Sequence, residues 1–140
     1  MNKIKLTINY KIANYIYNLF GLDTTIGIKH HFYTKVGAVA YPETKQLIFS
    51  LSLLKKDNFP RYLIWHEVGH LITSPSRHFC VENEVNAQIW AIKEAKRRGY
   101  HKLAKEFIDY VKGWGITASE SHNIIYSIAK HKILRQLNEK

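Results

Sequence analysis

Apolar side chains recur at helical spacing near the start of the chain. Ile12, Ile16 and Leu19 follow one another at intervals of four and three residues, so that they share one face of a helix. Polar residues fill the positions between them. The pattern predicts an amphipathic helix over residues 9–20 that ends near Gly21.

A strand-like pattern follows this first helix. Residues 31–41 are dense in aromatic and β-branched side chains, which favour extended structure. The segment 41–45 contains proline, glutamate and threonine and is typical of a turn, and the apolar run 46–51 follows it. We therefore predict a β-hairpin.

The second half of the chain is predicted to form four helices separated by prolines and glycines. The first has Asp57 or Asn58 as its N-cap and Pro60 in its first turn, where the missing N–H costs nothing. It should end near Thr73, because the residue before Pro75 is forced out of helical geometry. The others are expected over residues 80–98, 100–112 and 117–137.

This order of elements indicates the fold class. Strands and helices occupy separate parts of the chain, which predicts an α+β fold with a small twisted antiparallel or mixed sheet before a helical half. At 140 residues, 46% of them apolar, the chain can bury one core. We expect a single domain over residues 1–140, in which about residues 100–140 are a candidate regulatory helical extension.

Charge and cysteine content restrict the partners and the compartment. The formal net charge is +10, which could attract nucleic acid, but the basic residues mostly follow helical spacing, so solvated helix faces are favoured. The single cysteine excludes an intrachain disulfide. Neither a secretory signal nor a transmembrane stretch is evident, and we expect a soluble cytoplasmic protein.

The candidate chemistry lies in the helix that ends near Thr73. His66, Glu67 and His70 form an HExxH motif. Two histidines four residues apart project from one helix face, where both imidazoles can bind one Zn²⁺ ion. Glu67 is rotated by about 100° from His66 and can act on a water beside the metal without being a ligand. The apolar residues around the motif argue against two ordinary surface histidines.

A catalytic zinc needs a third protein ligand, and the next helix offers two. Glu82 and Glu84 both lie in its first turn, but they point about 200° apart, so only one can face the metal. We favour Glu82, because Asn86 follows it at i+4 and could hold a ligand imidazole. His78 and Cys80 are weaker alternatives: the HExxHxxGxxH spacing is absent, and a lone cysteine usually packs inertly.

These residues resemble a known family. HEVGH followed after a short loop by Glu82-Asn83-Glu84-Val85-Asn86 is similar to the gluzincin zinc metallopeptidases, especially their minimal prokaryotic and viral members, over residues 36–99. Val85 and Asn86 differ from the alanine and aspartate common in the family. The resemblance implies a zincin-like fold, a peptide substrate bound by the strand at residues 46–51, and close helix-to-sheet packing at Gly69.

The expected function is therefore zinc-dependent peptide hydrolysis. His66, His70 and Glu82 would hold Zn²⁺, and Glu67 would act as general base. The partner would be a peptide or protein substrate, and the C-terminal helices could keep the enzyme latent. The alternative is a zinc-bearing regulatory module that binds protein or nucleic acid with little proteolysis. A group that assists the oxyanion stays open among three residues, Tyr100, His122 and Tyr126.

Overall fold

The computed structural model describes residues 3–29, 38–50, 61–76, 79–114 and 120–138. Within them, five helices and a three-stranded mixed sheet form an α+β arrangement, as predicted. The elements in chain order are α1 (Lys3–Phe20), β1 (Thr25–Lys29), β2 (Ala38–Tyr41), β3 (Gln46–Ser50), α3 (Arg61–Thr73), α4 (Val81–Arg97), α5 (His101–Lys112) and α6 (Glu120–Gln136).

The local patterns predicted most of these elements. The helix ends at Gly21 and Gly99 are confirmed, and both glycines have positive φ angles of 69° and 81° that L-residues rarely adopt. The first helix, however, begins six residues earlier than predicted, at Lys3. The expected caps at residues 57–60 and at Thr117, and residues 31–37, lie outside the described part of the chain.

The sheet has the strand order β1-β3-β2. β2 and β3 form the predicted antiparallel hairpin, with Ala40 opposite Leu47. β1 was not predicted, because its five residues contain a glycine and lack a clear alternation of apolar and polar positions. It pairs in parallel with β3, with Ile26 opposite Leu47, so β3 is the central strand.

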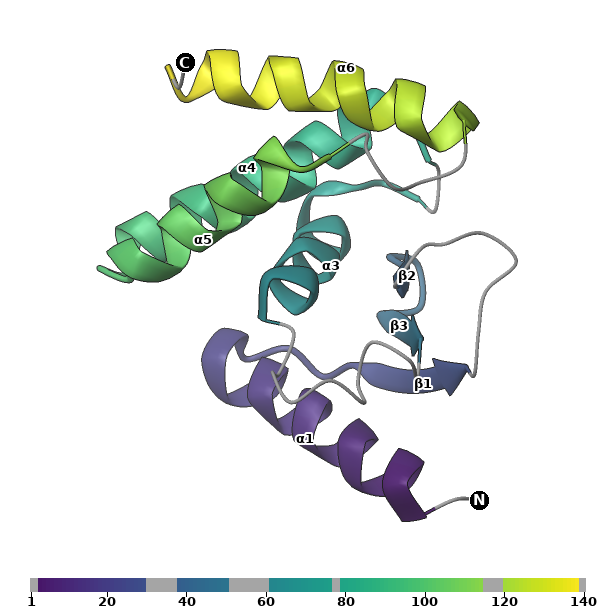
Figure 1. Cartoon of the computed structure of the whole chain (residues 1–140). Coiled ribbons are helices and arrows are strands. Elements are labelled where there is room, and N and C mark those ends of the chain that lie inside the picture. Colours follow the sequence, from purple (N-terminus) through teal and green to yellow (C-terminus); the bar gives the residue numbers. More distant parts are fainter. Residues whose placement is uncertain (1–2, 30–37, 51–60, 77–78, 115–119, 139–140) are drawn as a thin grey trace.

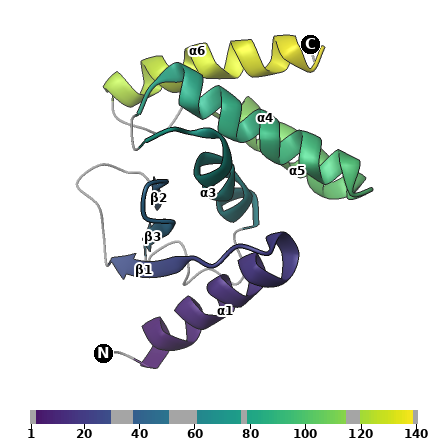
Figure 2. The same cartoon turned by 180° about the vertical axis from the view of Figure 1, so that it is seen from behind.

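Helix α3 lies between the sheet and the α4–α5 pair, and α1 and α6 lie at opposite ends of the molecule (Figures 1 and 2). Ile64 and Val68 of α3 join an apolar cluster with the sheet residues Leu47 and Phe49. Trp65 joins a second cluster built from α4, α5 and α6. Coverage from two sides explains why this helix is apolar nearly all round.

No described helix combines the length and the apolar character that a membrane span requires.

Candidate metal centre

The two histidines of the HExxH motif point their Nε2 atoms to a common place. His66 and His70 lie one turn apart on α3, and their Nε2 atoms are 3.1 Å apart. The ring planes are nearly perpendicular, at 88°. His66 is buried, whereas the His70 side chain is 12% exposed.

A very close approach of two helices brings a carboxylate to the same place. At Gly69, a Cβ atom would lie only 2.4 Å from the backbone oxygen of Ala87 on α4, so only glycine fits. The predicted role of Gly69 in close packing is therefore found, but the partner is a helix instead of the sheet. Glu84 precedes Ala87 by one helical turn and faces α3.

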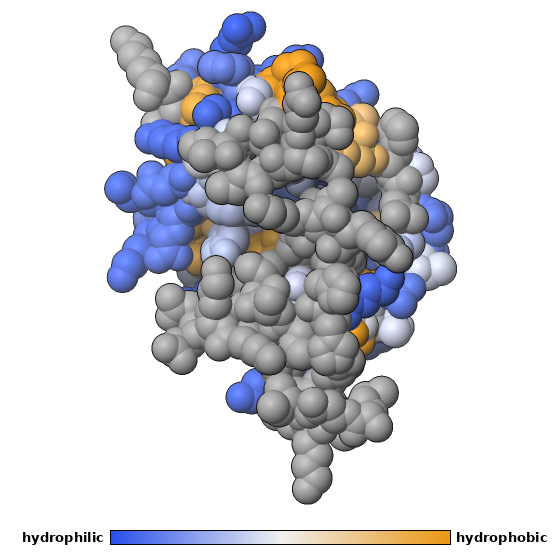
Figure 3. Space-filling model, turned by 45° about the vertical axis from the view of Figure 1, so that its right-hand side comes forward, coloured by the Kyte–Doolittle hydropathy of each residue, from blue (hydrophilic) through white to orange (hydrophobic). Residues whose placement is uncertain are grey.

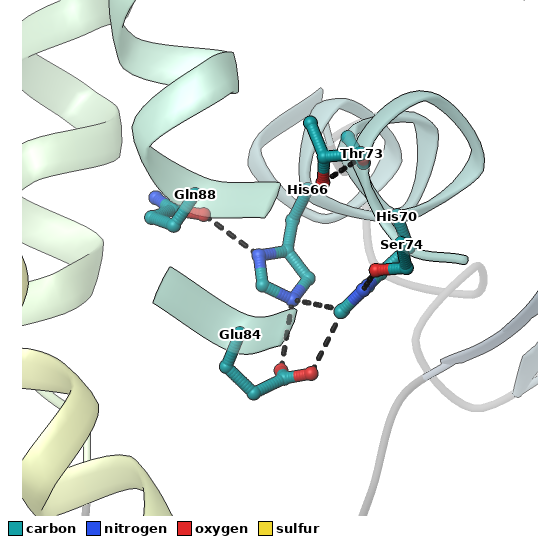
Figure 4. Close-up of polar contacts among 7 residues, drawn as sticks. His66, His70, Thr73, Ser74, Glu84 and Gln88 are labelled. Carbon is teal, nitrogen blue, oxygen red and sulfur yellow. Dashed lines mark hydrogen bonds and ion pairs between the residues drawn. The ribbon is translucent and has the colours of Figure 1, made fainter. Parts of the chain in front are cut away.

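Glu84 contacts both histidines (Figure 4). Its Oε1 is 3.1 Å from Nε2 of His66, and its Oε2 is 2.9 Å from Nε2 of His70. The carboxylate is buried with them. Two imidazole nitrogens and one carboxylate group, from two helices, thus meet in one place.

The choice of Glu82 as the third member of this group is corrected by the structure. Glu82 and Asn86 are both exposed on α4, and the imidazole contacts are made by Glu84 and Gln88. The sequence held a signal for this. Glu82 and Asn86 share a helix face with Lys93 and Arg97, since the four positions lie within about 60° around the axis, and such a charged face turns to solvent.

Gln88 fixes the orientation of His66. Its side chain is fully buried, and its Nε2 donates to the carbonyl oxygen of Phe107 at 3.1 Å. Because that carbonyl can only accept, the amide oxygen of Gln88 must face His66, where it lies 2.8 Å from Nδ1. His66 Nδ1 therefore donates to Gln88, and Nε2 is the nitrogen left free to bind a cation.

His70 is held by a different kind of partner. Its Nδ1 lies 2.9 Å from Oγ of Ser74, directly after the end of α3. The backbone N–H of Ser74 also donates to the carbonyl of His70 at 2.9 Å. A hydroxyl can donate or accept, so this contact directs Nε2 of His70 toward Glu84 without fixing the proton.

The local electrostatics favour a positive charge between the imidazoles and Glu84. Burial opposes protonation of His66, but the hydrogen bond and charge of Glu84 outweigh it and raise the pKa of His66 to about 9. Burial likewise opposes ionisation of Glu84, yet the hydrogen bonds from both histidines lower its pKa to about 2. A buried carboxylate facing two imidazole nitrogens is stable only with a proton or another cation between them.

Glu67 is a second buried carboxylate beside the histidines. One carboxylate oxygen of Glu67 and the ligand nitrogens of His66 and His70 all lie within 4.8 Å of one another. Burial raises the pKa of Glu67 above its ordinary value, against the lowering effect of both histidines. Because Glu84 is in direct contact with both imidazoles, contact distances favour Glu84 as a ligand and Glu67 as the neighbouring acid or base.

The group fits a Zn²⁺ ion. Zinc takes histidine nitrogen and carboxylate oxygen at about 2.0–2.1 Å, and tetrahedral geometry then separates ligand atoms by roughly 3.3 Å. The observed separations of 2.9 to 3.1 Å are close to this value. Small outward movements of side chains would admit the ion without moving either helix.

The other predicted candidates lie elsewhere or outside the described residues. Cys80 directly precedes α4, is partly buried and makes no side-chain cap. His78 and the side chain of His122 lie outside the described part of the chain. Tyr100 is 42% exposed at the start of α5. Tyr126 packs on Trp114, whose ring contacts that of His66.

The strand expected to bind substrate is also corrected. Residues 46–50 form β3, whose backbone pairs with β1 on one side and β2 on the other. Leu51 lies outside the described residues. Among the described strands, β2 is the edge strand that packs beside α3, and an added extended chain would have to pair there.

None of the protein families, curated proteins or solved structures compared with this chain matches it. The chemistry of the site therefore has to carry the functional argument by itself.

Proposed function

We propose that this chain is a zinc-dependent metallopeptidase of the gluzincin type, with a zincin-like fold. His66, His70 and Glu84 would hold the ion, and Glu67 would be the general base. The observation that carries the proposal is the meeting of the two Nε2 atoms, 3.1 Å apart, with the Glu84 carboxylate, whose two oxygens lie 3.1 and 2.9 Å from them, beside a further buried carboxylate. A structural role alone gives no reason to bury two carboxylates at this point.

The chain's own residues would divide the work of hydrolysis. When bound, Zn²⁺ lowers the pKa of a water toward 7 and polarises the scissile carbonyl. Glu67 would accept the proton of the attacking water and later deliver it to the leaving amine. Gln88 would keep the Nε2 atom of His66 directed at the ion, and Ser74 would do the same for His70.

Metal analysis of matched variants tests the ligand set. The wild type should bind one equivalent of zinc, and His70→Ala and Glu84→Gln should lose it. Glu82→Gln is the matched control, because it changes an exposed glutamate two residues away on the same helix. Full zinc content in Glu84→Gln, or iron in place of zinc in the wild type, would contradict the assignment.

Turnover tests the base. Glu67→Gln should keep its zinc, because Glu67 is not a proposed ligand, and should hydrolyse denatured casein about 10²–10⁴-fold more slowly than the wild type. The amide has nearly the same shape but cannot take a proton. A zinc-loaded Gln variant with wild-type turnover would remove Glu67 from this role.

A second function is favoured by a separate surface feature. A hollow of about 330 Å³ between α4 and α5 is bordered by cationic and imidazole side chains and by one acid. Hydrophilic residues are visible on several sides of the molecule in Figure 3. The polar lining residues of the hollow are Lys96, His101, Lys105, Asp109 and Lys112. A zinc-bearing module that binds nucleic acid would use such a surface.

DNA binding distinguishes this second function from the first. Affinity for a DNA oligonucleotide should fall steeply with salt, and Lys96→Glu should weaken it far more than Lys11→Glu, a charge-matched change on exposed α1. Equal losses in the two variants would indicate only non-specific attraction to a basic protein.

A further inference from the structure

The proposed catalytic side chains are almost completely covered. His66, Glu67 and Glu84 are 4%, 5% and 4% exposed, respectively. For the proposed reaction, a water within hydrogen-bond distance of Glu67 has to attack the peptide carbonyl, so the scissile bond must come close to these side chains. Helices α3 and α4 carry the three side chains, so the rest of the cover comes from other parts of the chain.

An arc of aromatic rings lies on the His66 side of this group. The indole of Trp114 stands perpendicular to the His66 imidazole, with 5.5 Å between ring centroids. Tyr126 of α6 packs on Trp114 at 5.1 Å and on Phe79, before α4, at 5.3 Å. Tyr110 of α5 contacts Trp114 from another side, at 6.0 Å.

The electrostatics show how near the arc is to the centre. Burial raises the pKa values of Tyr110 and Tyr126, and the negative charges of Glu67 and Glu84 raise them further. Both phenols therefore lie within range of the two carboxylates. The ring contact between Trp114 and His66 joins the aromatic arc to the proposed metal group.

The part of the cover that belongs to α6 is separable from the metal group. The described side-chain hydrogen bonds of His66, His70 and Glu84 all end on α3, on α4 or on Ser74. Helix α6 instead attaches through Ala129 and Ile133, which join the helical core cluster. A movement of α6 would thus take Tyr126 away from Trp114, the ring that contacts His66, and leave the proposed ligands in place.

Two apolar side chains of α6 are exposed. Ile124 and Ile128 are 59% and 45% exposed, and apolar surface is visible at the top of Figure 3, where α6 lies in Figure 1. They also offer a matched control, because they belong to the same helix as Tyr126 but face away from the core.

We propose that Tyr126, packed between Trp114 and Phe79, makes α6 an internal cover that closes the metal centre, and that this helix must move before a peptide can enter. The inference rests on the proposed metallopeptidase function and adds its regulation. It also gives a physical form to the predicted regulatory extension over about residues 100–140.

The test measures access to the centre in the full-length, zinc-loaded protein. Release of Zn²⁺ to an excess of a colorimetric chelator and hydrolysis of denatured casein are followed side by side. Tyr126→Ala removes two ring contacts and should accelerate both processes about tenfold. Tyr126→Phe keeps the ring and should release Zn²⁺ at the wild-type rate. Ile124→Ala changes an exposed side chain of the same helix and should match the wild type in both measurements.

The outcomes separate the cover from the peptidase. A folded, zinc-loaded Tyr126→Ala protein with wild-type rates would overturn the cover. Faster zinc release without casein hydrolysis in any variant would support the cover and refute the peptidase. A wild type that binds no zinc would refute both. If circular dichroism shows that Tyr126→Ala is unfolded, Tyr126→Leu replaces it, with a smaller acceleration of both processes expected and wild-type rates counting against the cover.

Discussion

His66 and His70 lie one turn apart on the same helix, yet their surroundings differ in kind. His66 is held by Gln88, which is itself held by the backbone of Phe107, so the contacts span 22 and 19 residues of sequence. His70 is held by Ser74, only four residues away. The Nδ1 partner of His66 therefore depends on the docking of α4 and α5, whereas the Nδ1 partner of His70 directly follows α3.

This difference indicates a rigid half and an adjustable half. A buried amide with both ends hydrogen-bonded leaves His66 one orientation and one neutral tautomer. A hydroxyl at a helix end, beside a histidine side chain that is 12% exposed, can rotate and exchange protons with solvent. We expect His66 to be preorganised for the metal and His70 to adjust when the ion enters.

The largest effect on stability and zinc binding should come from a change at Gly69, where α3 and α4 are in very close contact. Gly69→Ala would place a Cβ 2.4 Å from the oxygen of Ala87 and force α3 away from α4. The gain in helix propensity, about 1 kcal/mol, is smaller than the steric cost. We expect a net loss of about 2 kcal/mol or more in the free energy of unfolding, measured by urea denaturation. Zinc binding should weaken with it.

Gly27→Ala provides the control for this first change. A Cβ at Gly27 would meet a side-chain atom of Ile48 at 3.4 Å, an ordinary contact that a flexible side chain can accommodate. This variant should keep both its stability and its zinc. A Gly69→Ala protein as stable as Gly27→Ala would show that the two helices can separate without harm to the centre.

The second-largest effect on zinc affinity should come from Gln88, which holds His66 in the rigid half of the centre. Gln88→Met has a similar shape but leaves the Nδ1–H of His66 without an acceptor in a buried position. Zinc affinity should fall about 10–100-fold, measured by competition with a chelator. Asn86→Ala, on the exposed face of α4, should bind zinc like the wild type. The reverse order would restore Asn86 as the residue that supports the site.

The difference between local and long-range contacts also explains what the sequence could predict. The HExxH helix and its end before Pro75 follow from patterns within a few residues, and they were predicted. The partner of the histidines depends on which face of α4 packs on α3, and that face is set by the contact between Gly69 and Ala87, 18 residues apart. The amide of Asn86 at i+4 favours Glu82 on local grounds, whereas the face that Glu82 shares with a lysine and an arginine is turned to solvent.

The central position of β3 could not be predicted for a related reason. The hairpin of β2 and β3 joins neighbouring segments, and its turn residues predict it. The parallel pairing of β1 with β3 joins segments about 20 residues apart and leaves no local pattern in the sequence. It determines, however, that β3 is central and that β2 is the edge beside α3, so a prediction of the substrate strand needed the tertiary structure.

The smallest effect should appear in the adjustable half. Ser74→Ala removes the hydroxyl beside Nδ1 of His70, but solvent near this partly exposed side chain can replace it. We expect zinc affinity to fall only about threefold, within the range of one ordinary hydrogen bond. Thr73→Val is the control, because it removes a neighbouring hydroxyl that donates to the carbonyl of Gly69 at 2.8 Å. Its zinc affinity should not change. A loss in Ser74→Ala as large as that in Gln88→Met would mean that both imidazoles are held equally firmly, and the distinction between the two halves would have to be abandoned.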